Sequence, residues 1–148
     1  MSTGYSGTPL AKKLGMKAGM TVLTVNAPTG YLELVEPVPE GVRISEEEGS
    51  QATRRRGDGG RSNVDIVHLF TNSRDELFSE LARLRTVIKQ DGMIWVSWYK
   101  KAAKLPTEIT EDTVREAALP LGLVDVKVCA VDDKWSGLKV VIRKENRV

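Results

Sequence analysis

Residues 64–98 decide the fold, and they read VDIVHLFTNSRDELFSELARLRTVIKQDGMIWVSW. The first seven, Val64–Phe70, are almost continuously apolar and rich in β-branched side chains, which is typical of a strand buried on both faces. Ser73 and Glu76 then have the spacing of a capping box, in which each side chain satisfies a backbone N–H of the other. Apolar residues follow at helical spacing and predict an amphipathic helix: Leu77, Leu81, Leu84 and Ile88.

A second strand follows this helix. Gln90–Gly92 predicts a turn, and Met93–Trp98 is again a run of apolar, β-branched and aromatic residues. A strand, a crossover helix and a strand in this order are expected to be parallel and right-handed. The stretch therefore predicts the central β-α-β unit of an open, mostly parallel sheet.

Shorter elements are predicted toward the N-terminus. Thr8–Leu14 predicts a brief helix capped by Thr8, and Thr21–Val25 predicts the first strand. Asn26–Tyr31 reads as a turn, and a short helix from about its fifth residue must stop before Pro37. Val42–Ile44 predicts a weak second strand.

Toward the C-terminus, Thr110 is expected to cap a helix that ends before Pro120. Val124–Val131 and Leu138–Arg143 then have the spacing of an antiparallel hairpin at the edge of the sheet. The predicted fold class is α/β, with a mostly parallel sheet and a C-terminal antiparallel hairpin.

The composition fits one ordinary domain, residues 1–148, which is long enough to fold without a disulfide or a metal. The single Cys129 has apolar neighbours and is interpreted as a small buried side chain in a reducing compartment. Because the sequence has no apolar run of about 20 residues and begins with a polar segment, a cytoplasmic location is expected. The net charge of +2 is too small to draw the whole molecule to nucleic acid.

Residues 45–63 interrupt the apolar pattern. Glu46–Glu48, Arg54–Arg56 and Gly57–Gly60 supply charge and glycine, which predicts a mobile charged loop. An arginine tract can hold phosphate, but charge blocks of opposite sign with glycines are more often solvated.

Ligands of an open parallel sheet bind beyond the carboxyl ends of its strands. The polar residues predicted there are Asn26, Thr29, Gly30 and Tyr31 after the first strand, Thr71, Asn72 and Ser73 after the central strand, and Tyr99, Lys100 and Lys101 after the next. With Lys104, Trp95 and Trp98 nearby, this group could hold a phosphate and stack a base. Solvated lysines and packed tryptophans are nevertheless the more common outcome.

Few residues suit catalysis. His68 is the only histidine and hence the only catalytic candidate, although its place within an apolar strand favours a hydrogen-bonded structural role. One histidine and one cysteine cannot supply the ligands that zinc needs, so no metal site is predicted. Ser136 lacks the context of a hydrolase nucleophile. The hairpin residues Trp135, Gly137 and Lys139 are interpreted as an exposed surface that could contact a protein partner.

The predicted order of strands and crossover helices resembles the Rossmann-like three-layer sandwich of class I S-adenosylmethionine-dependent methyltransferases. Leu84–Val96, with its helix end, Lys-x-x-Gly and strand, is similar to the phrase before the fifth strand of those enzymes. Their third strand has no counterpart, since residues 45–63 take its place. Their glycine-rich turn after strand one is reduced to Asn26–Tyr31, which keeps one glycine. Glu46, Glu47 or Glu48 could supply their acidic residue for the cofactor ribose.

The chain also resembles, over nearly its whole length, a bacterial family of small proteins of unknown function. This resemblance implies a fold and a bacterial cytoplasmic setting but no activity. The phrases that carry it are Gly4–Leu10, Asn26–Pro28 with Gly30 and Tyr31, Val67–Phe70, Trp95–Trp98 with Lys100 and Lys101, Thr110–Asp112 with Val114–Glu116, and Gly122–Val131 with Trp135–Lys139.

Three functions are open. The leading hypothesis is a non-catalytic domain that binds a small anionic ligand or a protein partner, with no membrane association and no established cofactor. The first alternative is a methyltransferase that holds S-adenosylmethionine in the variant turn Asn26–Tyr31. The second, and least favoured, is non-specific and salt-dependent nucleic-acid binding through Arg54–Arg56 and Lys100–Lys104.

Overall fold

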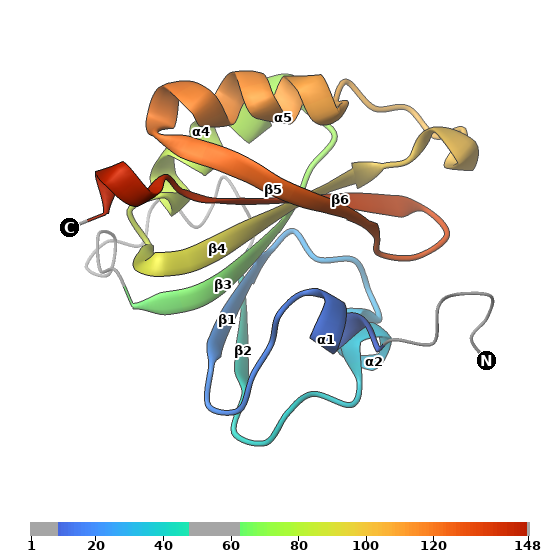
Figure 1. Ribbon diagram of the computed structural model, residues 1–148. Coiled ribbons are helices and arrows are strands. Elements are labelled where there is room, and N and C mark those ends of the chain that lie inside the picture. Colours follow the sequence, from blue (N-terminus) through green and yellow to red (C-terminus); the bar gives the residue numbers. More distant parts are fainter. Residues whose placement is uncertain (1–8, 48–62, 148) are drawn as a thin grey trace.

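Six strands form one mixed sheet in the computed structural model, which describes residues 9–47 and 63–147 (Figure 1). Their order across the sheet is β2-β1-β3-β4-β6-β5. The parallel strands are β1 (Thr21–Val25), β2 (Arg43–Glu47), β3 (Val64–Phe70) and β4 (Ile88–Tyr99). The antiparallel hairpin consists of β5 (Leu123–Ala130) and β6 (Trp135–Ile142), with β6 beside β4. The predicted sheet and its closing hairpin are confirmed.

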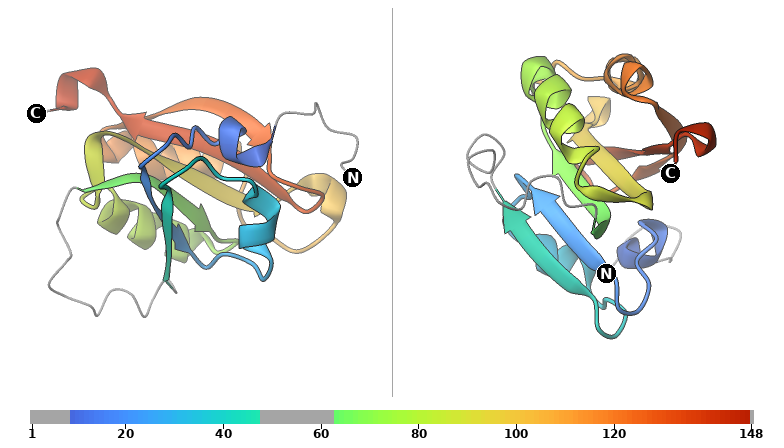
Figure 2. Two further views of the ribbon diagram at one scale, coloured as in Figure 1. Left: turned by 90° about the horizontal axis from the view of Figure 1, so that it is seen from below. Right: turned by 90° about the vertical axis from the view of Figure 1, so that its left-hand side faces the viewer.

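Helices cover both faces of the sheet, as the two views of Figure 2 show. On one face lie α4 (Arg74–Leu84) and α5 (Glu111–Ala118), and on the other lie α1 (Leu10–Lys13) and α2 (Tyr31–Val35). Three short 3-10 helices complete the described elements: η1 (Lys101–Ala103), η2 (Leu119–Leu121) and η3 (Lys144–Asn146). A separate buried cluster fills the space on each side of the sheet. The molecule is therefore the three-layer sandwich that the sequence predicts.

The central strand β3 explains why its sequence is apolar throughout. Val67 and Leu69 belong to the cluster beneath α4 and α5, whereas Ile66 and Phe70 belong to the cluster beneath α1 and α2. Since successive side chains of a strand point to opposite faces, both faces of β3 require apolar residues.

The fourth strand is longer than predicted. Ile88 begins β4 instead of ending the helix, and the predicted turn at Gln90–Gly92 lies within the strand. A shift in the β3–β4 register between Val64 and Ile66 accommodates this irregular segment. A Cβ added to Gly92 would lie 3.0 Å from the carbonyl oxygen of Asp65, so glycine is needed for a close backbone approach and not for a turn.

Two N-terminal boundaries also differ from the prediction. β2 runs to Glu47, so residues 45–47 are strand and not part of a charged loop, and they pair with Leu23–Val25 of β1. An edge strand can carry polar side chains because one of its sides faces solvent. A search for apolar runs in the sequence therefore does not detect its full length. Residues 48–62, with Arg54–Arg56, lie outside the described residues. The first helix begins at Leu10 after Pro9, and Thr8, its predicted cap, also lies outside them.

The prediction that Trp135 and Gly137 form an exposed contact surface on the hairpin is wrong. Trp135 is only 9% exposed and meets Phe70 edge-on at 4.9 Å between ring centroids, and Gly137 is buried too. A large aromatic side chain is better placed against the core than in water.

None of the helices in residues 9–47 and 63–147 is long and apolar enough to span a membrane.

Candidate functional site

The predicted ligand residues all follow β1, β3 or β4, but they lie in separate groups. Thr29, Gly30 and Tyr31 line a pocket beside the turn after β1, whereas Asn26 does not. Thr71, Asn72 and Ser73, which follow β3, make polar contacts around Glu76 and Tyr99. Tyr99, Lys100 and Lys101 line a larger pocket beside the end of β4.

Glu76 occupies the middle of this edge of the sheet. Its Oε1 accepts a 2.6 Å hydrogen bond from Thr71 Oγ1, and its Oε2 accepts a 3.2 Å bond from the Asn26 amide. The same amide donates to the Phe70 carbonyl at 3.2 Å. Ser73 Oγ accepts from the Glu76 N–H as predicted, but the carboxylate turns away from Ser73, so the reciprocal half of the capping box is wrong. The Asn26 amide and the Thr71 hydroxyl therefore donate hydrogen bonds to groups of the protein itself.

Asn72 ties the end of β4 to the segment before α5. Its Oδ1 accepts a 2.8 Å hydrogen bond from the Tyr99 N–H, and its carbonyl accepts a 2.9 Å bond from the Glu108 N–H. This side chain therefore fixes the backbone from which the following lysines extend.

The turn after β1 borders a pocket of about 310 Å³ that is acidic. Its lining residues are Ala27, Pro28, Thr29, Gly30, Tyr31, Leu32, Glu33 and Glu46. Glu46 comes from β2, whereas the other residues belong to the turn and to α2. Gly30 has φ +90° at the start of α2, and the nearest atom to an added Cβ would be Glu33 Oε1 at 3.9 Å. Gly30 is thus needed for its backbone angle and not for close contact.

His68 is the centre of a buried polar chain. Its Nδ1 lies 2.9 Å from Tyr31 Oη, and its Nε2 lies 2.8 Å from Ser97 Oγ. Burial lowers the pKa of His68 to about 3 and raises the pKa of Tyr31. The imidazole is therefore neutral at pH 7, and one ring nitrogen donates while the other accepts. Because His68 lines neither pocket, we interpret it as a structural residue.

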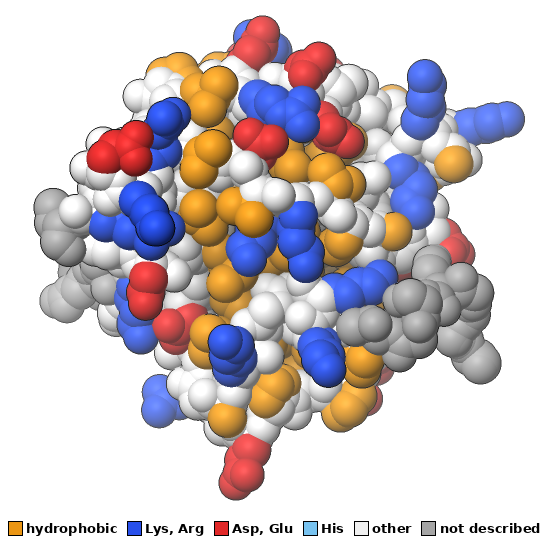
Figure 3. All heavy atoms as spheres, in the orientation of Figure 1, with side chains coloured by type: hydrophobic (Ala, Val, Ile, Leu, Met, Phe, Trp, Pro, Cys, Tyr) orange, Lys and Arg blue, Asp and Glu red, His pale blue; other side chains and the backbone are white. Residues whose placement is uncertain are grey.

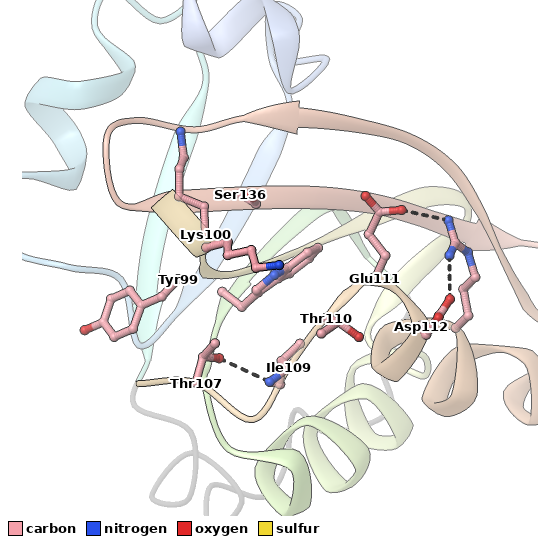
Figure 4. Close-up of a pocket in the computed structure, with 11 residues that line it drawn as sticks. Tyr99, Lys100, Thr107, Ile109, Thr110, Glu111, Asp112 and Ser136 are labelled. Atoms are coloured by element: carbon pink, nitrogen blue, oxygen red, sulfur yellow. Dashed lines mark hydrogen bonds and ion pairs between the residues drawn. The ribbon is translucent and has the colours of Figure 1, made fainter. Parts of the chain in front are cut away.

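The larger pocket, of about 470 Å³, lies where β4 ends and α5 begins (Figure 4). Trp98 and Ile109 give it a buried apolar floor. Thr107 Oγ1 accepts a hydrogen bond from the Ile109 N–H at 3.2 Å and so fixes the segment before α5. The complete lining is Trp98, Tyr99, Lys100, Lys101, Thr107, Ile109, Thr110, Glu111, Asp112, Arg115 and Ser136.

The two acidic side chains of this pocket both pair with one arginine. Arg115 contacts Glu111 and Asp112, each at 3.0 Å, and Asp125 at 3.1 Å. The hydrogen bonds that Arg115 donates, to Asp125 first and to Glu111 second, raise the pKa of its guanidinium. Within the described ranges, the ammonium groups of Lys100 and Lys101 form no ion pair.

The aromatic residues contribute less than the sequence predicts. Trp95 is fully buried on the opposite face of the sheet, where its Nε1 donates to the Leu14 carbonyl at 2.9 Å. Tyr99 contacts Trp135 at 4.6 Å between ring centroids, and its hydroxyl points away from the pocket (Figure 4). Trp98 lines the pocket but is only 6% exposed. Base stacking on a tryptophan platform is therefore not available here.

Cys129 does not form a reactive site in this structure. Burial raises the pKa of its thiol, and the nearby charges of Lys13 and Lys127 act in the opposite direction. The thiolate fraction at neutral pH is therefore small, but the side chain is half-buried and not fully buried as predicted.

Several pocket residues were not among the predicted ligand residues. Ile109, Arg115 and Ser136 reach the pocket from segments distant from β4 in the chain. The cap at Thr110 was a usable signal, because it predicted where α5 begins, and the structure confirms it. No local pattern indicated that this helix start would lie against the lysines.

Comparisons with known proteins agree with this architecture. A family profile described as "Protein of unknown function (DUF3052)" matches residues 11–144. No curated protein sequence is significantly similar to the chain.

Similar solved structures include a SAM-dependent methyltransferase from Aquifex aeolicus, with 17% identity, a TM-score of 0.61, and coverage of 88% of this chain and 86% of that one. A TehB-like SAM-dependent methyltransferase from Corynebacterium glutamicum has 12% identity, a TM-score of 0.62, and coverage of 95% and 90%. A chain from the complex of the Haloferax volcanii Trm112 methyltransferase activator has 14% identity, a TM-score of 0.60, and coverage of 90% and 87%. These similarities show a Rossmann-like, methyltransferase-like fold.

Proposed function

This chain belongs to the DUF3052 family of proteins of unknown function, and we propose that it is a non-catalytic domain that binds a small anionic ligand in the pocket beside β4. The observation that carries this proposal is the unequal pairing of the pocket's charges. Arg115 pairs with both Glu111 and Asp112, whereas Lys100 and Lys101 have no acidic partner in the described part of the chain. Two ammonium groups are therefore available to an anion.

The lining also limits the chemistry of the ligand. A volume of about 470 Å³ lies within the range of about 300–1,000 Å³ that small-molecule pockets span. Trp98 and Ile109 offer an apolar floor, and hydroxyl groups of Thr107 and Ser136 lie at the wall. This combination suits a phosphate or carboxylate group joined to a less polar body. A mononucleotide such as adenosine 5′-monophosphate has this chemistry.

We expect reversal of both lysines to abolish anion binding. Adenosine 5′-monophosphate at about 100 times its dissociation constant should stabilise the wild-type protein by about 2.7 kcal/mol. Hydrogen bonds to charged groups contribute about 1.5–3 kcal/mol each, so Lys100→Glu and Lys101→Glu should each weaken binding by about tenfold or more. Calorimetry and thermal unfolding with this nucleotide and with pyrophosphate measure both effects.

Lys104→Glu is the matched control, because Lys104 is exposed nearby but does not line the pocket. It should leave the affinity within about twofold of the wild type if the effect comes from direct contact. Equal affinities for the wild type and the double reversal would refute the anion pocket. Failure of both probes to bind the wild type would direct the search to a protein partner.

A second candidate function is S-adenosylmethionine binding at the turn after β1. The observation in its favour is that Glu46 lines the same pocket as the turn, where an acid could bind ribose hydroxyls. The fit is incomplete. The turn carries one glycine, and the open space beside Gly30 shows that no close backbone approach has been built there. We therefore derive no methyl-transfer step.

Calorimetry with S-adenosylhomocysteine separates the two candidates. The anion-pocket proposal predicts no heat of binding at the turn. Binding that Glu46→Gln weakens tenfold or more, and that Lys101→Glu leaves unchanged, would instead favour the cofactor site. Glu33→Gln is the matched control, since Glu33 lines the same pocket but belongs to α2 and not to the end of β2.

A further inference from the structure

Lysines gather on the face of the β5–β6 hairpin that points away from α4 and α5. Lys127 of β5 and Lys139 of β6 are directly opposite each other in the strand register. Lys13 of α1 donates to the carbonyl of Ala130, at the end of β5, over 3.4 Å. Lys17 follows α1 and is close enough for its charge to act on Lys139. We call these four residues, Lys13, Lys17, Lys127 and Lys139, the lysine face.

The surroundings of the lysine face are basic and apolar. Figure 3 shows basic side chains between the hairpin and α1, with apolar side chains among them and acidic ones toward the edges of the view. Among the described residues, Lys17, Lys127 and Lys139 form no ion pair. Burial and then the charges of Lys127 and Lys17 lower the pKa of Lys139. The positive charges of Lys17, Lys127 and Lys139 therefore gather here without an acidic partner among the described residues.

This accumulation does not help the protein to fold. Like charges directly opposite each other on paired strands are destabilising. Threonine or valine at either position would suit a strand better and would remove the repulsion. The pair Lys127 and Lys139 thus costs stability that a bound anion would restore.

The shape of the lysine face favours an extended anion over a small one. The four lysines come from four different segments and spread across the surface, and none of them lines the pockets described above. The other side chains on this side of β5 and β6 include Val124, Cys129 and Val141, which are not aromatic, and Trp135, which is buried against the core. Without an aromatic platform there is no means of stacking unpaired bases.

We propose that the lysine face binds the phosphate backbone of double-stranded nucleic acid without reading its sequence. Lysines act on phosphates as point charges, and such contacts need neither a pocket nor a fixed orientation. This surface is separate from the anion pocket beside β4, so either proposal can fail alone. Three phosphate contacts, from Lys17, Lys127 and Lys139, predict a slope of about −2.7 in a plot of log affinity against log salt concentration.

Fluorescence anisotropy with a labelled DNA duplex, from 25 to 200 mM NaCl, tests this proposal. Lys127→Thr and Lys139→Thr should each reduce the slope by about 0.9 and weaken binding about eightfold at 0.1 M salt, the effect of one lost phosphate contact. Each variant should also have a higher Tm than the wild type at low salt, because the like-charge pair is gone. A merely solvated lysine would leave the salt slope and the affinity unchanged, whereas the change in Tm reports only the like-charge pair.

Lys104→Gln is the control for net charge, because it removes one exposed lysine that belongs neither to the lysine face nor to the lining of the anion pocket. It should change neither the salt slope nor the Tm by a comparable amount. Absence of duplex binding at 25 mM salt, or binding that both hairpin variants leave intact, would overturn the proposal. Equally tight binding of polyglutamate, lost in the same two variants, would overturn it in favour of an acidic protein partner.

Discussion

Acidification is expected to destabilise this protein steeply below about pH 6.5, because its only histidine is buried and neutral. Burial lowers the pKa of His68 to about 3, whereas an unfolded chain protonates histidine near 6.5. The unfolded state therefore binds a proton that the folded state excludes. The resulting contribution to the free energy of unfolding is fully present above pH 6.5. It is lost as the pH falls toward 3, by about 1.4 kcal/mol per pH unit.

The contribution of His68 can be separated from that of the carboxylates with a variant. His68→Gln lacks the titrating ring, so its stability should fall less than that of the wild type between pH 6.5 and pH 5, by about 2 kcal/mol. The variant should also be less stable at pH 7 by about 1–3 kcal/mol, because Tyr31 or Ser97 loses a buried partner. Urea unfolding at several pH values measures both effects. Parallel pH profiles would show that folding does not exclude this proton.

Trp95→Ala is expected to remove about 3–5 kcal/mol of stability, the usual cost of deleting a large buried aromatic side chain. Its ring is fully buried, and its Nε1 donates to the Leu14 carbonyl just after α1. On the opposite side, a Cβ added to Gly137 would lie only 3.3 Å from the ring, so the fit is tight. Because domains are stable by about 5–15 kcal/mol in total, this variant should be close to unfolding at 37 °C.

Trp95→Phe tests the two contributions separately. It keeps an apolar ring but loses the hydrogen bond to Leu14, and should therefore cost less than the alanine variant. Hydrogen exchange in residues 10–14 should increase in both variants, because the indole fixes α1 to the sheet. A loss below about 1 kcal/mol for Trp95→Ala would contradict the packing described here.

Local patterns were sufficient for elements whose sequence is determined by burial against the core. The continuous apolar run of β3 and the spacing of α4 both predicted the observed element, since burial determines each of them. The irregular segment of β4 was not predictable in the same way. Glycine is required at position 92 because the backbone of β3 lies close to it, and this contact leaves no local pattern in the sequence. The edge strand β2 likewise depends on its pairing with β1, and its own side chains carry little information.

The candidate site shows the same division. Chain order predicted which strand ends would carry Tyr31, Thr71 and Lys100. It did not predict that Asn26 and Thr71 would both donate hydrogen bonds to the Glu76 carboxylate. It also did not predict that Arg115 of α5 would pair with Asp125 of β5, since this contact joins two different elements.

Titration of ¹⁵N-labelled protein with adenosine 5′-monophosphate, followed by NMR, tests the central claim most directly. The anion pocket predicts saturable shifts for residues 98–101, 107–112 and 136, including the Trp98 indole, and their loss in the Lys100→Glu/Lys101→Glu variant. Shifts confined to residues 27–33 and 46, or to the lysine face, would contradict it, as would shifts at the pocket that persist in the variant.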